Sequence, residues 1–350
     1  MAEKAGKCRK IAGKVKLRFE LAIFAAVMDA FRTVMPLIPA PVLMRHREPV
    51  LLMGSCFTEH IGHKLSERKF HTALNPFGIV YNPISLAEGM HRLYTQDDAF
   101  ELFEHQGLWH SWDHHGKFSG PDQDETLALL RGRLREAAAF CKQAKWLVIT
   151  FGTAEVSVLR ESGRVVANNH KMPGPLFDQR RLSVTEVVDA WLPLLQQCAD
   201  KQVILTVSPV RHLRQGLVEN QRSKAVLLLA CEELSRQLPH VHYFPSYELL
   251  MDDLRDYRFY AADMAHPSPV AIDYIWKHFC NTYFDAATQD RNDLIQKIRV
   301  AMEHRPFHPE LPQHQAFLQA QLDRIQWAQQ TYPDLDWTEE IQYFSSGLLS

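Results

Sequence analysis

Two potential nucleophiles, Ser55 and Cys56, stand side by side in LLMGSCFTEHIG, where an apolar run gives way to a helical pattern. α/β enzymes often place a nucleophile where a strand ends at a small residue and turns into a helix. A serine needs a neighbouring base to take its proton, whereas a cysteine attacks as the thiolate. Ser55 could instead be a helix cap. Cys56 falls one residue inside the helical pattern and should turn toward the core, so we favour Ser55.

A base of the required kind is found in YAADMAHPSP, where Asp263 and His266 are three residues apart. In a D-x-x-H turn, the carboxylate can hold one imidazole nitrogen while the other nitrogen faces the nucleophile. The pair alone is a weak pattern, but with the Gly-Ser turn it predicts a Ser55-His266-Asp263 triad. Asp256 is an alternative carboxylate, although its ten-residue separation from His266 implies no local geometry.

Four short apolar runs that alternate with helical patterns are expected to position these residues. Strands that are apolar on both faces and alternate with helices indicate a parallel sheet covered by helices on both sides. Such sheets bind ligands at the carboxyl ends of their strands. Chemistry is therefore expected at Ser55, at Gly152-Thr153 and in the loop from Ser208 to His212. The predicted strands are Pro49–Ser55, Lys145–Thr153, Gln202–Val210 and Val241–Ser246.

Other segments complete the predicted organisation. EVSVLRESGRVVANNH alternates around Ser162-Gly163, which predicts a hairpin inserted after the strand that ends at Gly152. Residues 1–27 are basic and then apolar, and we interpret them as a leader that is disordered or not native. Residues 28–285 are predicted to form the catalytic domain. Residues 286–350 are predicted to form a helical C-terminal extension packed on it.

Six segments in order resemble the motifs of a known family: GSCFTEHIG, NPFGIVYNP, FGTAEV, VANNHK, TVSPVRH and DYRFYAADMAHPSP. They are similar to the GSCFA domain family, named for a Gly-Ser-Cys-Phe-Ala motif, within the SGNH/GDSL hydrolase superfamily. Thr58 stands where that motif has alanine. The resemblance implies a three-layer flavodoxin-like fold, with Ser55 as nucleophile and Asp263 and His266 as the D-x-x-H pair.

The resemblance is incomplete at the oxyanion hole. Superfamily enzymes usually stabilise the oxyanion with the nucleophile's N–H, a glycine N–H and an asparagine side chain in a G-x-N-D block. Ser55 and Gly78 match the first two roles. The third block reads Gly152-Thr153-Ala154-Glu155 and lacks the asparagine. The third donor could be Thr153, Asn75 or Asn168, and the sequence does not choose among them.

Polar residues near the predicted strand ends are candidates for binding the substrate. Arg211 and His212 follow a strand directly, and His212 is the other histidine to be considered as a base. The alternative is a surface loop for Arg211 and His212, and a simple turn for Asn168 and His170. The predicted substrate-binding residues are Asn75, Gly152, His170, Arg211 and His212.

The segment GLWHSWDHHGKFSG is rich in histidine but does not predict a metal site. Metal ligands must converge on one point, and the adjacent His114 and His115 would point in opposite directions on a strand. Trp109, Trp112 and Phe118 could form an aromatic wall for a sugar or acyl chain, or could belong to the core.

The composition excludes several classes of protein. A formal net charge of −2 over 350 residues argues against a nucleic-acid partner. The sequence lacks an apolar run of the roughly 20 residues that a membrane span needs. Six cysteines without CxxC spacing favour a cytoplasmic protein with reduced thiols. Export through the N-terminal leader is the alternative.

These observations predict an esterase that hydrolyses a small O-acyl or O-acetyl ester, including esters on carbohydrate, without a metal or an organic cofactor. The chemistry follows from the triad, whereas the substrate is an analogy, since a fold does not determine a substrate. Three alternatives stay open: an acyltransferase with the same triad, a hydrolase that uses Cys56, and a non-catalytic binding module. The sequence does not predict the oligomeric state.

Overall fold

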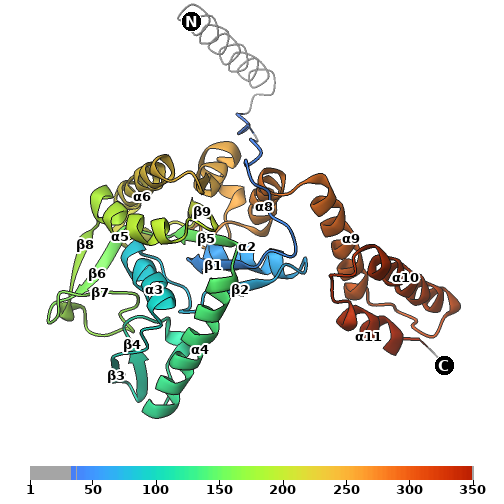
Figure 1. The fold of residues 1–350 in the computed structure, drawn as a ribbon, viewed down its shortest axis with the longest axis horizontal. Coiled ribbons are helices and arrows are strands. Elements are labelled where there is room, and N and C mark those ends of the chain that lie inside the picture. The colour runs from blue at the N-terminus through green and yellow to red at the C-terminus, as the bar shows by residue number, and fades with distance from the viewer. Residues whose placement is uncertain (1–32, 37, 349–350) are drawn as a thin grey trace, which may run out of the picture.

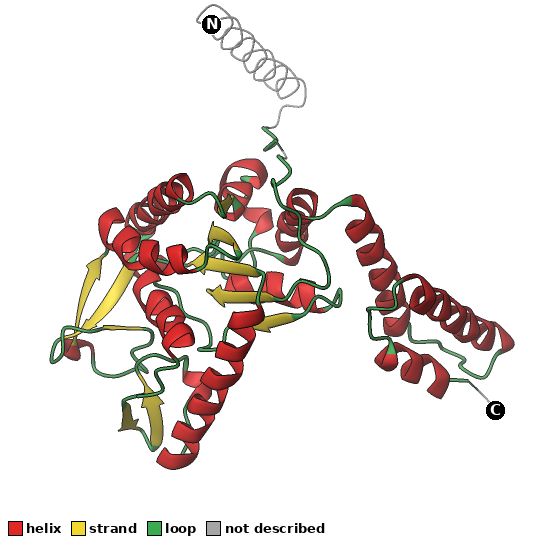
Figure 2. Cartoon of the chain, viewed as in Figure 1, coloured by secondary structure: helices red, strands yellow, loops and turns green. Residues whose placement is uncertain are grey.

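The four predicted apolar runs, together with a fifth strand that was not predicted, form a parallel sheet in the order β10-β9-β5-β1-β2. Figure 2 shows the strands of this sheet with helices around them. The computed structural model describes residues 33–36 and 38–348. β1 pairs with β5 along its whole length, which places Gly54 opposite Thr150. The strand order is that of flavodoxin-like sheets. The strands are β1 (Val50–Gly54), β2 (Thr72–Leu74), β5 (Trp146–Phe151), β9 (Gln202–Val207) and β10 (Val241–Phe244).

Helices cover both faces of this sheet, because its strands are apolar on both sides (Figure 1). Leu51 and Met53 of β1 pack into one core with α3, α4, α5 and α6. Val50 and Leu52 pack into a second core with α2 and α8. This alternation follows from the two-residue period of a strand. The helices are α2 (Cys56–Ser66), α3 (Pro83–Thr95), α4 (Gln123–Gln143), α5 (Val184–Gln197), α6 (Leu217–Gln237) and α8 (Pro269–Tyr283).

Two antiparallel additions extend from the sheet. The hairpin predicted around Ser162-Gly163 is formed by β6 and β7, and β8 pairs with the other edge of β6. A second hairpin, β3–β4, was not predicted; its turn residues Gln106 and Gly107 both have positive φ, as in a type I′ turn. The strands are β3 (Leu102–His105), β4 (Leu108–Ser111), β6 (Glu155–Leu159), β7 (Val165–Val166) and β8 (Phe177–Arg181).

The last three helices, α9 (Ala286–Glu303), α10 (Pro312–Thr331) and α11 (Thr338–Ser346), surround a hydrophobic core of their own. In Figure 1 they lie at the opposite end of the molecule from the two antiparallel additions. Lys69, in the turn after α2, joins them to the sheet domain through an ion pair with Glu340 at 2.8 Å. With these helices, the sheet and the inserted hairpin, the predicted α/β fold class is confirmed.

Short helical turns connect several of these elements. The segment between β10 and α8 begins with a single α-helical turn and continues as a π-helix. These turns are η1 (Gly116–Phe118), η2 (Gly174–Leu176), η3 (Leu213–Gln215), α7 (Ser246–Glu248), the π-helix η4 (Leu249–Leu254) and η5 (Tyr257–Phe259).

Two predictions concern the termini and the membrane. The predicted leader, residues 1–27, lies outside the residues that the structure describes. Among residues 33–36 and 38–348, no helix combines the length and the apolar character needed to cross a membrane.

Candidate active site

Ser55 lies at the turn from β1 to α2, at the carboxyl edge of the sheet. Gly54 before it has φ of 147°, and a Cβ there would lie 2.3 Å from the carbonyl oxygen of Thr150, so only glycine fits. The Ser55 Oγ accepts a hydrogen bond from the N–H of Phe57 at 3.3 Å, which makes Ser55 the N-cap of α2. Capping uses a lone pair and leaves the hydroxyl proton for a base. The Ser55 residue is fully buried.

Asp263 and His266 form the predicted pair. The Asp263 Oδ2 lies 2.6 Å from the His266 Nδ1, and both side chains are about half exposed. The Asp263 Oδ1 accepts hydrogen bonds from the N–H groups of His266 at 3.0 Å and of Ala265 at 2.9 Å. These backbone bonds, with a smaller effect of the imidazole, lower the Asp263 pKa to about 2. The carboxylate is therefore ionised at neutral pH and orients the ring.

The turn that carries this pair is held against the loop after β9. The Arg211 N–H donates to the carbonyl oxygen of Ala265 at 3.1 Å. Burial lowers the pKa of His60 on α2, and the positive charge that His266 can carry lowers it further. The structure contains no hydrogen bond between Ser55 and His266, so a complete triad requires a further approach of these two groups.

Three of the predicted oxyanion donors already have partners. The Ser55 N–H donates to the Thr150 carbonyl at 3.3 Å, and the Gly78 N–H donates to the Asn75 carbonyl at 2.8 Å. The Thr153 N–H donates to the Tyr81 carbonyl at 3.1 Å, and the Thr153 hydroxyl bonds to Ser223 at 3.0 Å. Each of these N–H groups would have to release its carbonyl before it could hold an oxyanion.

Asn75 offers a donor that is not in use. Its Oδ1 accepts a hydrogen bond from the Gly54 N–H at 2.9 Å, which orients the amide beside the nucleophile turn. The Nδ2 is buried and has no partner among the described residues. Asn75 has φ of 43°, a left-handed conformation that asparagine tolerates better than most residues. The predicted residue Asn75 therefore holds an unpartnered amide N–H group next to the residue that precedes Ser55.

A cavity of about 490 Å³ opens beside the carboxyl edge of the sheet. It contains four of the predicted residues, Thr153, Asn168, Arg211 and His212. The other predicted residues, Ser55, Asn75, Gly78, Gly152, His170, Asp263 and His266, do not line it. Its lining also includes Ile79, Tyr81, Asn82, His115, Glu155, Ser157, Val166, Ala167, Asn169, Gln179, Leu213, Arg214 and Gln215.

The two other candidate histidines are neutral at physiological pH. Burial, together with the charges of Lys224 and His266, lowers the His212 pKa to about 3. The His212 Nε2 is buried without a partner among the described residues, and the ring lies edge-on to Tyr81. The His170 Nε2 bonds to the Ser111 carbonyl at 2.8 Å, and burial lowers its pKa to about 4. Such low pKa values make both imidazoles weak bases.

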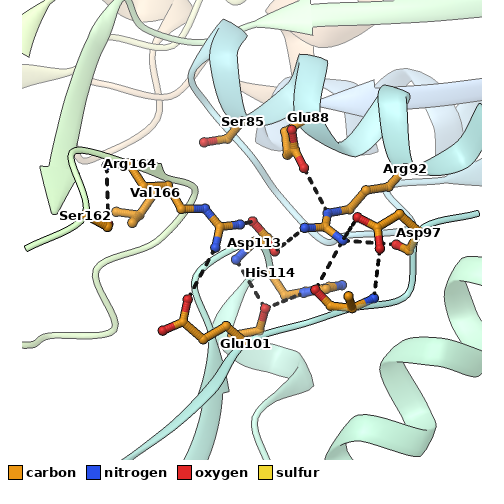
Figure 3. A network of polar contacts seen from close by, with 12 residues as sticks. Ser85, Glu88, Arg92, Asp97, Glu101, Asp113, His114, Ser162, Arg164 and Val166 are labelled. Atoms are coloured by element: carbon orange, nitrogen blue, oxygen red, sulfur yellow. Dashed lines mark hydrogen bonds and ion pairs between the residues drawn. The ribbon is translucent and has the colours of Figure 1, made fainter. Parts of the chain in front are cut away.

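Asn168 and His170 lie on the loop after β7. A buried ion-pair network links α3 to the residue that precedes β7 (Figure 3). Arg92 on α3 contacts Asp97 at 3.0 Å and Asp113 at 3.6 Å, and its side chain is 7% exposed. Asp113 also pairs with Arg164, which directly precedes β7. Buried, multiply paired charges resist displacement because separating them leaves a charge without a partner. The network therefore holds β7 and the cavity-lining loop after it against α3.

Trp112, from the histidine-rich segment, belongs to the core: its ring stacks on Phe103 with centroids 3.7 Å apart, and its residue is 5% exposed. Phe118 is also buried. Among the residues that the structure describes, no three histidine, cysteine, aspartate or glutamate side chains are grouped to hold a metal ion.

Fold and site together define a three-layer α/β protein with a serine and an Asp-His pair at the carboxyl edge of its sheet. The chain belongs to the GSCFA family, whose model matches residues 49–279. A second model, for the GSCFA domain protein C-terminal domain, matches residues 295–350.

Similarity to individual proteins is much weaker. No curated protein matches the chain. A crystal structure of a "putative acylhydrolase" from Bacteroides fragilis matches with 10% identity, covering 73% of this chain and 91% of the other. The TM-score of 0.36 is too low to support a functional comparison.

The Asp263 pKa provides a test of the pair's geometry. Because the folded pKa lies below its ordinary value of 3.8, the stabilisation from this carboxylate is present above that value and is lost as the pH falls through about 2. We expect His266→Ala to raise the pKa only part of the way, because the backbone N–H groups of residues 265 and 266 remain. A ¹³C NMR titration of the Asp263 carboxyl carbon measures this. A complete return to 3.8 would contradict the geometry.

Proposed function

We propose that this protein is a serine hydrolase that cleaves esters of small acyl groups, with Ser55 as nucleophile and His266 as base. The observation that carries the proposal is the 2.6 Å contact between the Asp263 carboxylate and the His266 Nδ1, on a turn at the same edge of the sheet as Ser55. This contact fixes the tautomer with the proton on Nδ1. The Nε2 is thereby left to accept the proton of the serine hydroxyl.

The reaction has two halves. The Ser55 Oγ bonds to the ester carbonyl carbon while its proton passes to the His266 Nε2, and the carbonyl oxygen becomes an oxyanion. The intermediate then collapses, the bond to the alcohol oxygen breaks, and this oxygen takes the proton from His266. Water next attacks the acyl-Ser55 ester with His266 as base, which releases the carboxylic acid and restores the serine.

Asn75 is our proposed side-chain donor to the oxyanion. Its Nδ2 is buried and has no partner among the described residues. The hydrogen bond that the Gly54 N–H donates to its Oδ1 holds the side chain next to the residue before Ser55. Thr153 is a weaker candidate, because both its N–H and its hydroxyl are already bonded. A preorganised donor of this kind costs no reorganisation when the charge develops.

Access to Ser55 requires a conformational change, since the residue is fully buried. Tyr81 is a residue whose movement would connect the cavity with the nucleophile turn. It lines the cavity, packs on Gly152, and its phenol is close enough to Cys56 for the two groups to interact electrostatically. Such gating is common in enzymes that exclude water from the reaction.

The cavity favours an alcohol that carries many hydroxyl groups, such as a carbohydrate. Side-chain amides both donate and accept hydrogen bonds, as recognition of hydroxyl groups requires. A volume of about 490 Å³ is within the usual range for small-molecule sites. The amide-bearing residues of the lining are Asn82, Asn168, Asn169, Gln179 and Gln215.

A hydrolase that uses Cys56 is the second candidate, because Cys56 is more exposed than Ser55. Burial raises the pKa of the Cys56 thiol, which keeps it protonated and a weak nucleophile at neutral pH.

The acyltransferase alternative uses the same triad with an alcohol in place of water. Formation of a new ester when glycerol or glucose is added as acceptor would reveal it. A non-catalytic binding module would show no turnover.

Hydrolysis of p-nitrophenyl acetate tests the choice of nucleophile. We expect the wild-type protein to hydrolyse it, Ser55→Ala to lose the activity, and Cys56→Ala to retain most of it. The last variant is a matched control, since it changes the adjacent residue in the same turn. Loss of activity in Cys56→Ala with retention in Ser55→Ala would assign the reaction to the thiol. No activity in the folded wild type would favour the binding module.

Asn75→Ala tests the oxyanion donor. Removing one such donor is expected to lower kcat by about 10² to 10³ with little change in KM, because the bond is made chiefly in the transition state. Asn168→Ala is the control: it removes an amide from the cavity and should change KM more than kcat. Equal effects of the two variants on kcat would contradict the assignment of Asn75.

A further inference from the structure

A fully buried lysine, Lys224, lies behind the proposed site. It is carried by α6, and its residue is 1% exposed. Its Nζ donates to the carbonyl oxygens of Gly152 at 2.6 Å and of Ser208 at 2.7 Å. These two residues directly follow β5 and β9, so the ammonium group joins the carboxyl ends of two neighbouring strands.

No carboxylate among the described residues pairs with Lys224. The ring of Tyr247 lies beside it, with its centroid 5.7 Å from the Nζ. Burial without a counter-ion lowers the Lys224 pKa to about 7. Taking an unpaired ammonium out of water is costly, and hydrophobic residues of similar size often replace buried charges without loss of stability. Stability alone therefore gives little reason for a lysine here.

A second buried lysine provides a comparison within the same molecule. Lys201 is 4% exposed, and its Nζ bonds to the carbonyl oxygens of Ala144 at 3.1 Å and of Lys142 at 3.4 Å. It lies before β9, at the amino edge of the sheet. Unlike Lys224, it has a carboxylate partner, Asp200 at 3.2 Å. A lysine without a counter-ion thus stands at the edge that carries the proposed chemistry.

Lys224 and Ser55 both form hydrogen bonds to carbonyl groups at the end of β5. The Ser55 N–H donates a hydrogen bond to the carbonyl oxygen of Thr150. Lys224 donates to the carbonyl oxygen of Gly152, two residues further along the chain. Burial raises the Cys56 pKa, and the Lys224 ammonium acts in the opposite direction on that thiol. The same ammonium also lowers the His212 pKa. Positive charge in a water-excluded site stabilises negative charge that develops nearby.

We propose that Lys224 is a positioning residue of the reaction: it holds the Gly152 and Ser208 carbonyls and, in its protonated form, supplies the positive charge that favours the oxyanion formed when Ser55 attacks. The inference rests on the proposed function, because it needs Ser55 to be the nucleophile. Lys224 makes no bond to the substrate and exchanges no proton in either half of the reaction. Its contribution is the field at the carbonyl oxygen and the geometry of two loops.

The rate at which a fluorophosphonate labels Ser55 measures this effect directly, since the reaction builds negative charge on the phosphoryl oxygen. We expect Lys224→Met to lower the second-order labelling rate constant by about 10², comparable to the loss of an oxyanion donor. Lys201→Met, the matched control, should label at the wild-type rate. Circular dichroism shows whether each variant is folded. Should Lys224→Met not fold, Lys224→Gln replaces it, because glutamine keeps one donor without the charge.

Chemical rescue separates charge from structural support. In Lys224→Ala, added ethylammonium should restore labelling, whereas ethanol, of similar size but neutral, should not. Equal rescue by both compounds, or wild-type labelling of folded Lys224→Met, would overturn the inference and leave the proposed function intact. An unlabelled wild-type protein would instead overturn the proposed function, and with it this inference.

Discussion

The site depends on the close approach of the Gly54 backbone to the Thr150 carbonyl, where β1 and β5 end side by side. Because a Cβ at position 54 would lie 2.3 Å from that oxygen, only glycine fits at this position. The close approach of Gly54 to β5 places Ser55 at the start of α2. The Gly54 N–H donates a hydrogen bond to the Asn75 Oδ1, and the Gly54 carbonyl accepts one from the Val80 N–H. Thus one contact between strands aligns the proposed nucleophile, the proposed oxyanion donor and the loop that leads to the cavity.

Several costly polar features lie at this edge of the sheet, although buried polar atoms without partners in the described part of the chain also occur on α9, at Asn292 and Gln296. Ser55 is buried, the Asn75 Nδ2 and the His212 Nε2 have no partners among the described residues, and Lys224 has no carboxylate. Buried polar groups in stable proteins are normally satisfied, and the exceptions often mark functional sites. At the amino edge, by contrast, Lys201 has both carbonyl and carboxylate partners. This difference between the two edges supports the proposed site at the carboxyl edge.

Local patterns predicted much of this structure. The apolar runs identified β1, β5, β9 and β10, because strands covered on both faces must be apolar on both faces. The D-x-x-H spacing predicted the Asp263–His266 contact, because three residues suffice to form that turn. The role of Lys224 was not predicted, because its hydrogen-bond partners are 72 and 16 residues away in the sequence. The sequence of its helix has an ordinary amphipathic pattern that does not distinguish this lysine. Likewise, the bonds that occupy the Ser55 and Gly78 N–H groups depend on how the loops pack. The roles of the predicted site residues stay predictions.

The identity of the acylated residue tests the central claim most directly. The protein would be quenched in acid during turnover of p-nitrophenyl acetate, and its peptides sequenced by tandem mass spectrometry. The account predicts one acetyl group on Ser55, as an oxygen ester that resists neutral hydroxylamine. An acetyl group on Cys56, as a thioester that hydroxylamine removes, would contradict it. So would turnover without an acetyl group on either residue.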